Sequence, residues 1–328
     1  MKIFQSIIAC AVCLAVFLFT PFVAYQKTTA QDYFPVQTPE HKLVLTIWNV
    51  DLFEGGVGSR TDFLNERFLE FGEKGVLALT KSHTKESAEN ALKKGETPDV
   101  LSFGVGLDGV AQYALQLPKT EFLGGEYGGK TYAYPWCAGG YFLIRKTAEN
   151  QPIDRLFVSQ NNFNLPYLAI ENEQIEAREV RFEKPLDAYV EFLAGGSADA
   201  LLGTQRDIKR LESRKATFYA QPIGDFSDIV QYVAILTKDE LRYEKSLKFV
   251  QYLTGEKAQK KLVEIGMQSP FFNVYDGEEL FGFDLKKIRF TVSPFTESRF
   301  LTAIIDELKV KTPTNDSLLR LKSVLKRL

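Results

Sequence analysis

The strongest constraint on the fold is an alternation of strand and helix patterns that begins at residue 43. Residues 43–50 (LVLTIWNV) are apolar and β-branched, as in a buried strand, and apolar residues recur at helical spacing from residue 61. The same patterns predict a strand, a helix and a strand at residues 76–82, 85–95 and 98–104. Strands that alternate with helices predict a largely parallel sheet, and ligands bind such sheets outside the carboxyl ends of the strands.

The N-terminus predicts export from the cytoplasm. Lys2 precedes an apolar run over residues 7–19, Pro21 ends that run, and a small-residue site follows that ends at Ala30. This order is typical of a secretory signal peptide that is cleaved after Ala30. The apolar character extends over residues 3–24, about the length of a membrane span, so an uncleaved N-terminal membrane anchor is the alternative. In both cases we expect a secreted or cell-surface protein, outside the cytoplasmic membrane.

The composition fits a globular protein and argues against nucleic-acid binding. The chain has 328 residues, of which 45% are hydrophobic, and this length favours two domains. Its formal net charge is −2, and no basic run is long enough to follow a phosphate backbone. We therefore expect no nucleic-acid partner.

Residues that often carry catalysis or metal binding are sparse. Cys10 and Cys13 lie in the N-terminal apolar segment, so cleavage would leave only Cys137 and no intrachain disulfide. The two histidines, His41 and His83, lie outside any metal-binding or catalytic motif. We therefore expect a protein that is not an enzyme and uses no metal or cofactor. A glycosidase with paired carboxylates is an alternative, because a sequence does not reveal the distance between carboxylates.

The glycine-rich loop at residues 51–60 is the first candidate site. Its glycines lie between a predicted strand and a helix start, where free N–H donors favour an anionic or polar group. Arg60 would be the charged partner of that group, and the acids could accept hydrogen bonds from hydroxyl groups. A tight turn without a ligand is the alternative. The candidate ligand-binding residues here are Asp51, Glu54, Gly58, Ser59 and Arg60.

Further candidates lie at predicted strand ends and at aromatic, proline-containing segments. Trp48 and Trp136 are the only tryptophans, and an indole ring packs well against the apolar face of a sugar, although core packing is the alternative. Arg206 follows a predicted strand-to-helix turn, where a guanidinium beside an amide suits a polyol or carboxylate, and a salt-bridged surface turn is the alternative. The full set of these candidates is Trp48, Ser102, Phe103, Trp136, Gln205, Arg206, Asp207 and Tyr232.

Four stretches carry a resemblance to a known family: PDVLSFG (98–104), YAYPWCAGGYFLIRK (132–146), LLGTQRDIKRL (201–211) and YEKSLKFVQYLTGEKAQKKLVEIGMQSPFF (243–272). The last is similar to the family's lysine-rich helix, followed by F-x-x-Y-L-T, A-Q-K and glycine. From about Lys42 to the C-terminus, the chain resembles an extracellular solute-binding protein of an ABC importer, in the family-1 group of sugar- and maltodextrin-binding proteins. It departs from that family in lacking a well-placed lipoprotein cysteine, which leaves lipid tethering without support.

The resemblance implies a two-lobe periplasmic-binding-protein-like α/β fold of type II. Each lobe would be a mixed, largely parallel sheet flanked by helices, and hinge crossings near residues 132–139 and 221–231 would join the lobes. A small polar solute, a carbohydrate or sugar derivative, would bind between the lobes of a monomer that delivers it to the membrane subunits of an ABC permease. A surface sensor or adhesion module on the same fold is the alternative.

The resemblance also implies a division of the chain. Residues 150–180 give no clear periodicity and stay unassigned. The expected parts are a signal peptide or anchor (1–30), a linker (31–41), the first part of lobe 1 (42–134), the first part of lobe 2 (135–226), the return to lobe 1 (227–292) and C-terminal helices that pack on lobe 2 (293–328).

Overall fold

The computed structural model describes residues 42–120, 124–147, 151–161, 163–172, 174–194, 198–271, 288–310 and 315–327. The signal segment and linker expected at residues 1–41 lie outside the described residues. Over the ranges described, no helix is both long and apolar enough to cross a membrane.

The first lobe is built on a five-stranded sheet in the order β2-β1-β3-β13-β6. Its strands are β1 (Leu43–Val50), β2 (Val76–His83), β3 (Val100–Phe103), β6 (Tyr134–Ala138) and β13 (Val230–Ile235). β1 pairs with β3 in parallel, whereas β13 pairs antiparallel with both β3 and β6. Every residue of β3, β6 and β13 is buried, because helices or loops cover both faces of the sheet.

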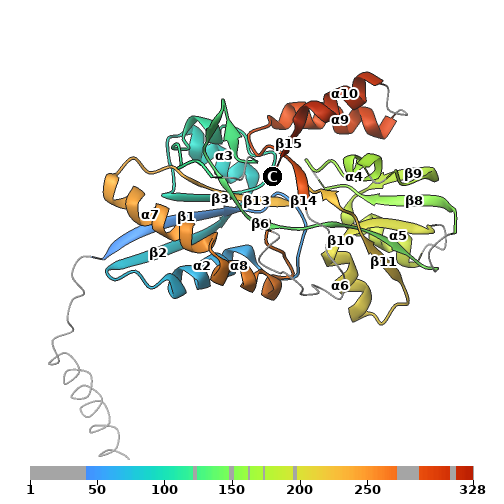
Figure 1. Ribbon diagram of the computed structural model, residues 1–328, viewed down its shortest axis with the longest axis horizontal. Coiled ribbons are helices and arrows are strands. Elements are labelled where there is room, and N and C mark those ends of the chain that lie inside the picture. Colours follow the sequence, from blue (N-terminus) through green and yellow to red (C-terminus); the bar gives the residue numbers. More distant parts are fainter. Residues whose placement is uncertain are drawn as a thin grey trace, which may run out of the picture. The chain divides into compact units, whose positions relative to one another are not determined.

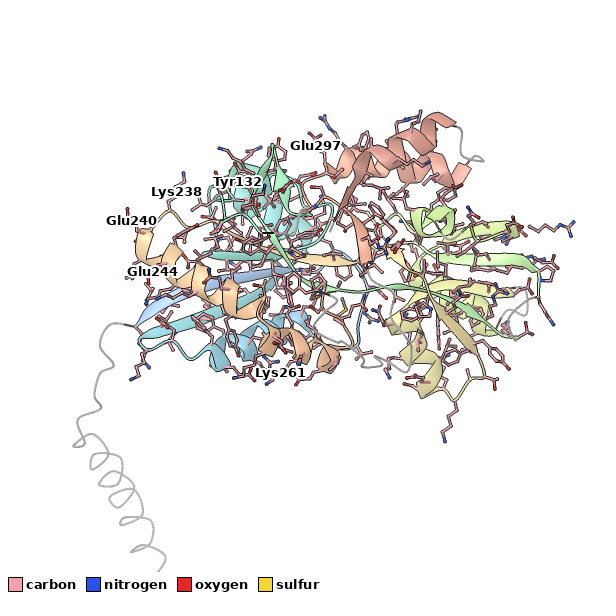
Figure 2. The ribbon with its side chains drawn as sticks, viewed as in Figure 1. Tyr132, Lys238, Glu240, Glu244, Lys261 and Glu297 are labelled. Carbon is pink, nitrogen blue, oxygen red and sulfur yellow. The ribbon has the colours of Figure 1, made fainter. Side chains whose placement is uncertain are left out.

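Helices cover both faces of this sheet (Figure 1). They are α2 (Arg60–Phe71), α3 (Lys85–Lys93), α7 (Glu240–Leu253) and α8 (Glu256–Gln259), with the 3₁₀ helices η1 (Val110–Gln112) and η2 (Lys260–Ile265). The Ser59 side chain caps α2 by accepting a hydrogen bond from the Asp62 N–H. α7 buries Phe249, while its exposed acids Glu240 and Glu244 point away from the sheet (Figure 2).

The second lobe is built on a sheet in the order β11-β7-β10-β8-β9. Its strands are β7 (Tyr141–Arg145), β8 (Ile153–Ser159), β9 (Ala177–Glu183), β10 (Ala200–Thr204) and β11 (Tyr219–Pro222), and its helices are α4 (Tyr167–Asn172), α5 (Pro185–Ala194) and α6 (Gln205–Ser213). β8 pairs in parallel with β9 and β10, and β7 pairs antiparallel with β10 and β11. β8, α4 and most of β9 account for the segment that the sequence leaves unassigned.

The chain passes between the two sheets through short crossings. Gly139 and Gly140 connect β6 to β7, and residues 223–229 lead from β11 back to β13. The buried Asp228 accepts a hydrogen bond of 2.7 Å from the Tyr141 hydroxyl, which ties the second crossing to the start of β7. Both crossings lie where the aromatic, proline-containing segments predict them, and the predicted two-lobe α/β fold is confirmed.

The C-terminal part adds a small three-stranded sheet and two helices. The sheet joins β12 (Asp225–Phe226), β14 (Ile288–Val292) and β15 (Leu325–Arg327). The helices are α9 (Ser298–Val310) and α10 (Asn315–Val324). The sequence predicts C-terminal helices over residues 293–328, but residues 325–327 form β15 because their backbone pairs with β14. The lobe boundaries and the packing of residues 293–328 on lobe 2 stay predictions.

Candidate functional site

Two neighbouring loops at one edge of the first sheet form the candidate site. β1 and β3 run in parallel and end in register at Val50 and Phe103. A Cβ added at Gly104, just after β3, would lie 3.3 Å from the ring of Phe53, just after β1. The two loops are therefore in contact at the carboxyl ends of parallel strands, where sheets of this kind bind ligands.

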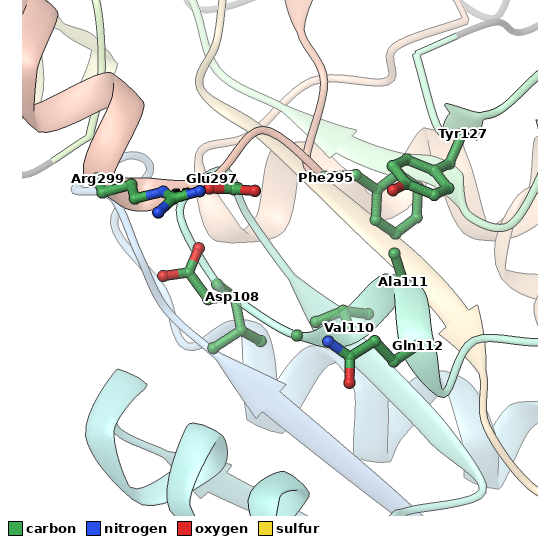
Figure 3. A pocket seen from close by; sticks show the side chains of 10 residues that line it. Asp108, Val110, Ala111, Gln112, Tyr127, Phe295, Glu297 and Arg299 are labelled. Carbon is green, nitrogen blue, oxygen red and sulfur yellow. Dashed lines mark hydrogen bonds and ion pairs between the residues drawn. The ribbon is translucent and has the colours of Figure 1, made fainter.

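The loop after β3 lines a pocket of about 390 Å³ (Figure 3). A second wall comes from the hairpin of β4 (Glu126–Tyr127) and β5 (Lys130–Thr131), and a third from the segment that leads into α9. Its volume lies within the range that accommodates small ligands. The lining residues are Leu107, Asp108, Gly109, Val110, Ala111, Gln112, Tyr127, Phe295, Glu297 and Arg299.

One end of the pocket is aromatic. The ring of Phe295 is centred 5.9 Å from the ring of Tyr127 and 5.9 Å from that of Phe103. Phe103 is buried beneath Phe295, whereas Tyr127 is 54% exposed. This end therefore offers an open ring face and a phenolic hydroxyl, which suit the apolar face and hydroxyl groups of a sugar ring.

The other end of the pocket is charged. The Asp108 carboxylate accepts hydrogen bonds from the N–H (2.8 Å) and the hydroxyl of Ser298, at the first residue of α9. This contact satisfies a free donor of the helix and places a negative charge at its N-terminus. Glu297 and Arg299 form an ion pair beside it (Figure 3). The charged groups at this end are thus already partnered, and exposed Gln112 adds an amide to the pocket wall.

The loop after β1 uses two donors of the expected anion site for contacts within the protein. The N–H groups of Val57 and Gly58 donate to the Ile265 carbonyl at 2.9 and 3.3 Å. Gly56 has a φ of +67°, and a Cβ there would lie 2.3 Å from the same carbonyl oxygen. The glycines therefore allow a close approach between two backbone segments, and two of the expected donors are used within the protein.

Arg60 is also committed to internal contacts. Its Nε lies 2.6 Å from the Asp51 carboxylate, and its Nη2 donates to the Phe53 carbonyl at 2.9 Å. Its guanidinium carbon stacks 4.2 Å from the centre of the Phe53 ring, and the residue is only 6% exposed. The ion pair of Arg60 with Asp51 fixes the loop after β1, and the Asp51 carboxylate neutralises the positive charge of Arg60.

Glu54 reaches from the same loop to α6 of the second lobe. Its carboxylate lies 3.4 Å from Arg210 Nη2 and 3.7 Å from Arg206 Nε. Arg210 also lies 3.3 Å from Asp207, which caps α6 by accepting from the Thr204 N–H at 2.9 Å. Burial raises the pKa of the Asp207 carboxyl, and the Thr204 N–H and Arg210 oppose that shift. We call Asp51, Glu54, Arg60, Arg206, Asp207 and Arg210 the charged cluster.

Beneath these loops, a network of buried hydrogen bonds joins the strand ends. The Ser102 hydroxyl accepts from the Trp136 indole N–H at 3.1 Å and donates to Asn49 at 2.9 Å. Gln231 donates to Asn49 at 3.1 Å, and Asn49 in turn donates to Asp51 at 3.0 Å. This buried network, which comprises Asn49, Ser102, Trp136 and Gln231, therefore connects four strands to the charged cluster.

Several predicted binding residues lie in the core of this structure. Trp136 is fully buried and stacks on Phe63 of α2 with ring centres 5.7 Å apart. Phe103 and Tyr232 are buried on the opposite, α3 side of the sheet. Trp48 is nearly buried, and its ring lies 4.3 Å from that of His83. These side chains support the strand ends and present little or no surface to a solute.

Gln205 lies at the first position of α6 and faces the first crossing. Both polar atoms of its amide are buried without a hydrogen-bond partner, and its Oε1 would lie 3.2 Å from a Cβ on Gly139. Of the predicted candidates, the structure brings together Asp51 with Arg60, and Glu54 with Arg206. It leaves Gln205 apart from those contacts, and Ser59 serves as the cap of α2.

The sequence patterns miss the pocket residues and part of the charged cluster. Tyr127 precedes Gly128 and Gly129, which both have positive φ, so an aromatic residue beside a Gly-Gly turn is the signal that was available. Asn49 and Gln231 are polar residues inside otherwise apolar strands. Because buried polar groups need hydrogen-bond partners, such residues indicate a buried hydrogen-bond network.

The cysteine that the structure describes is poorly suited to reactive chemistry. Cys137 is a buried free thiol, and burial raises its pKa to about 12, so the thiolate needed for nucleophilic or redox chemistry is scarce. No group of three or more histidine, cysteine, aspartate or glutamate side chains in the described ranges could hold a metal ion.

Comparison with solved structures places the fold. No protein-family model matches the sequence. A comparison with curated proteins also gives no match. The sugar-binding protein MalE from Xanthomonas citri is similar, with a TM-score of 0.60 and 12% identity over 86% of this chain and 96% of that protein. This chain has the fold of a solute-binding protein.

Two further structures support the same fold. The GacH receptor of Streptomyces glaucescens gives a TM-score of 0.56 and 12% identity, over 86% of this chain and 97% of the receptor. Maltose-bound MalE3 of T. maritima gives a TM-score of 0.51 and 14% identity, over 85% of this chain and 97% of that protein. The likeness spans nearly the whole of each structure, so it covers both lobes.

Proposed function

We propose that this chain is an extracytoplasmic solute-binding protein. It captures a small polar solute, a carbohydrate or sugar derivative, between its lobes and delivers it to the membrane subunits of an ABC permease. Capture is non-covalent and uses no metal, cofactor or chemical step. The protein acts as a monomer outside the cytoplasmic membrane, with its N-terminal segment as a signal peptide or an anchor.

The observation that carries the proposed ligand class is the chemistry of the pocket at the carboxyl edge of the first sheet, which is lined by residues of the first lobe and the C-terminal part. Tyr127 and Phe295 form an aromatic end, while Asp108, Glu297 and Arg299 form a polar end. A sugar ring has an apolar face and a rim of hydroxyl groups, so it can use both ends at once. The similar structures are titled as a sugar-binding protein, a receptor in complex with acarbose and a maltose-bound protein, which favours the same ligand class.

A thermal-shift screen tests the proposal. The panel holds neutral mono- and disaccharides, sugar acids, polyols and short peptides, because a ligand that binds only the folded protein raises its melting temperature. We expect a saturable rise with at least one carbohydrate. A rise with peptides alone, or with no member of the panel, would contradict the carbohydrate assignment.

Two measurements on the positive compound separate transport binding from its alternatives. Small-angle scattering should show a smaller radius of gyration at saturation, because a clamp closes by hinge bending. Product analysis should show that the sugar stays intact after prolonged incubation. Release of new reducing ends would instead support a glycosidase with paired carboxylates.

A further inference from the structure

The charges of the charged cluster balance within the protein. Its three guanidinium groups, on Arg60, Arg206 and Arg210, face three carboxylates, on Asp51, Glu54 and Asp207. The contacts pair every guanidinium with at least one carboxylate at 3.7 Å or less. A solute that enters between these groups therefore meets no uncompensated positive charge.

The three carboxylates differ in accessibility and in what they hold. Asp207 is buried and caps α6, and Asp51 holds the buried Arg60. Glu54 is different, because its side chain is 39% exposed and it belongs to the loop after β1, while both of its partners belong to α6. The side chains of Arg206 and Arg210 are 42% and 25% exposed. Glu54 thus forms ion pairs with two accessible arginines, which would otherwise attract an anion.

The backbone N–H donors near Glu54 also have partners within the protein. At the start of α6 the Thr204 side chain accepts from the Arg206 N–H, and the Asp207 carboxylate accepts from the Thr204 N–H. In the loop after β1, the N–H groups of Val57 and Gly58 donate hydrogen bonds to the Ile265 carbonyl. The helix start and the glycine loop therefore do not replace the arginines as an anion site.

We infer that Glu54 is a specificity-determining residue that makes the site reject anionic solutes and accept uncharged ones. It acts by supplying the carboxylate that Arg206 and Arg210 would otherwise take from a sugar acid or a phosphate. This inference rests on the proposed function, because it assumes that the solute reaches the groups between the lobes. It also names the substrate class more closely, as an uncharged polyhydroxy compound.

The test compares the wild type with Glu54→Gln, which removes the charge and keeps the shape of the side chain. Glu212→Gln is the matched control, because Glu212 lies on α6 with the two arginines, is exposed to the same degree as Glu54 and pairs with Lys209 at 2.7 Å. The first probe is inorganic phosphate, followed by thermal shift against chloride at equal ionic strength. The second is a matched pair, glucose and glucuronate, titrated by calorimetry.

We expect phosphate to stabilise Glu54→Gln saturably and to have no such effect on the wild type or on Glu212→Gln. We expect glucuronate to bind Glu54→Gln roughly fivefold more tightly than it binds the wild type, the size of a typical accessible ion pair. Adding Arg210→Gln to Glu54→Gln should remove most of both gains. The affinity for glucose should change less than twofold.

Two results would overturn the inference. The first is a wild type that binds glucuronate as tightly as glucose, and the second is a Glu54→Gln protein that responds to phosphate like Glu212→Gln. If glucose and glucuronate bind none of these proteins, the choice of hexoses under the proposed function is wrong. The phosphate titration, which needs no sugar, then still decides whether Glu54 shields the arginines.

Discussion

The pocket and the charged cluster lie on touching loops, yet they present opposite surfaces to a solute. The pocket has an aromatic end, where Tyr127 is half exposed and its ring contacts that of Phe295. In the charged cluster, each guanidinium is paired with a carboxylate of the protein. Under the proposed function, this difference separates affinity from selectivity: the pocket offers contact surface to the solute, and the charged cluster offers it no unpaired positive charge.

The buried network explains how both regions keep their geometry. Ser102 lies in β3, just before the loop that lines the pocket, and Asn49 donates a hydrogen bond to Asp51 of the charged cluster. A buried hydrogen-bond network is costly to disturb, so it holds the two loops in a fixed register. Changes in the network and in the buried Arg60 should therefore affect stability, whereas changes in the exposed side chains of the two regions should affect solute binding.

The largest expected effect is the loss of stability in Trp136→Ala. This change removes a fully buried ring that stacks on Phe63 and breaks its hydrogen bond to Ser102. We expect the free energy of unfolding to fall by about 3–5 kcal/mol, as measured by urea denaturation. A fall below about 1 kcal/mol, together with a loss of solute affinity, would place Trp136 in the solute site instead of the core.

Phe295→Ala should have the next largest effect, and it should appear in binding. Phe295 contacts Tyr127 at the aromatic end and shields Phe103 below it. We expect the binding free energy of the solute to weaken by about 1–3 kcal/mol in calorimetry, since aromatic anchors carry much of the energy of a binding site. If a folded Phe295→Ala protein kept full affinity for the solute, the pocket would not be the solute-binding site.

The strands and most helices of this fold could be predicted from the sequence, because apolar periodicity is a local property. Residues 43–50, for example, become β1 as the pattern requires. The pocket could not be predicted, because its walls come from Asp108, Tyr127 and Phe295, which only the tertiary fold brings together. The burial of Trp136 was also beyond the sequence, since its position at a strand end does not reveal that its ring stacks on Phe63 of α2.

Arg60→Gln should affect stability more than solute binding, in contrast to Phe295→Ala. Arg60 is buried against Phe53 and holds Asp51, so its loss should lower the free energy of unfolding by about 1–2 kcal/mol. It should change solute affinity less than Phe295→Ala does, because its charge is already neutralised by Asp51. Parallel denaturation and calorimetry on both variants measure this contrast, and a larger affinity loss in Arg60→Gln would restore the loop as an anion site.

Glu70→Gln should have the smallest effect on stability. It removes a negative charge from a residue outside the pocket and the charged cluster, so it serves as a control for solute selectivity. The hydrogen bond from Lys261 lowers the pKa of Glu70, with help from Arg67. A lowered carboxyl pKa stabilises the folded state above the ordinary value of 4.5, and this stabilisation is lost as pH falls through the lower folded value. We expect a cost below about 1 kcal/mol at pH 7 that disappears in acid, with unchanged solute selectivity.

The most direct test of the central claim, that the pocket binds the solute, is a calorimetric comparison of Tyr127→Ala with Tyr219→Ala. Both tyrosines are about half exposed, but Tyr127 lines the pocket, whereas Tyr219 lies on β11 of the second lobe. With the carbohydrate found in the thermal-shift screen, Tyr127→Ala should bind about tenfold or more weakly than the wild type, and Tyr219→Ala should bind normally. Equal affinities in all three proteins would contradict the account.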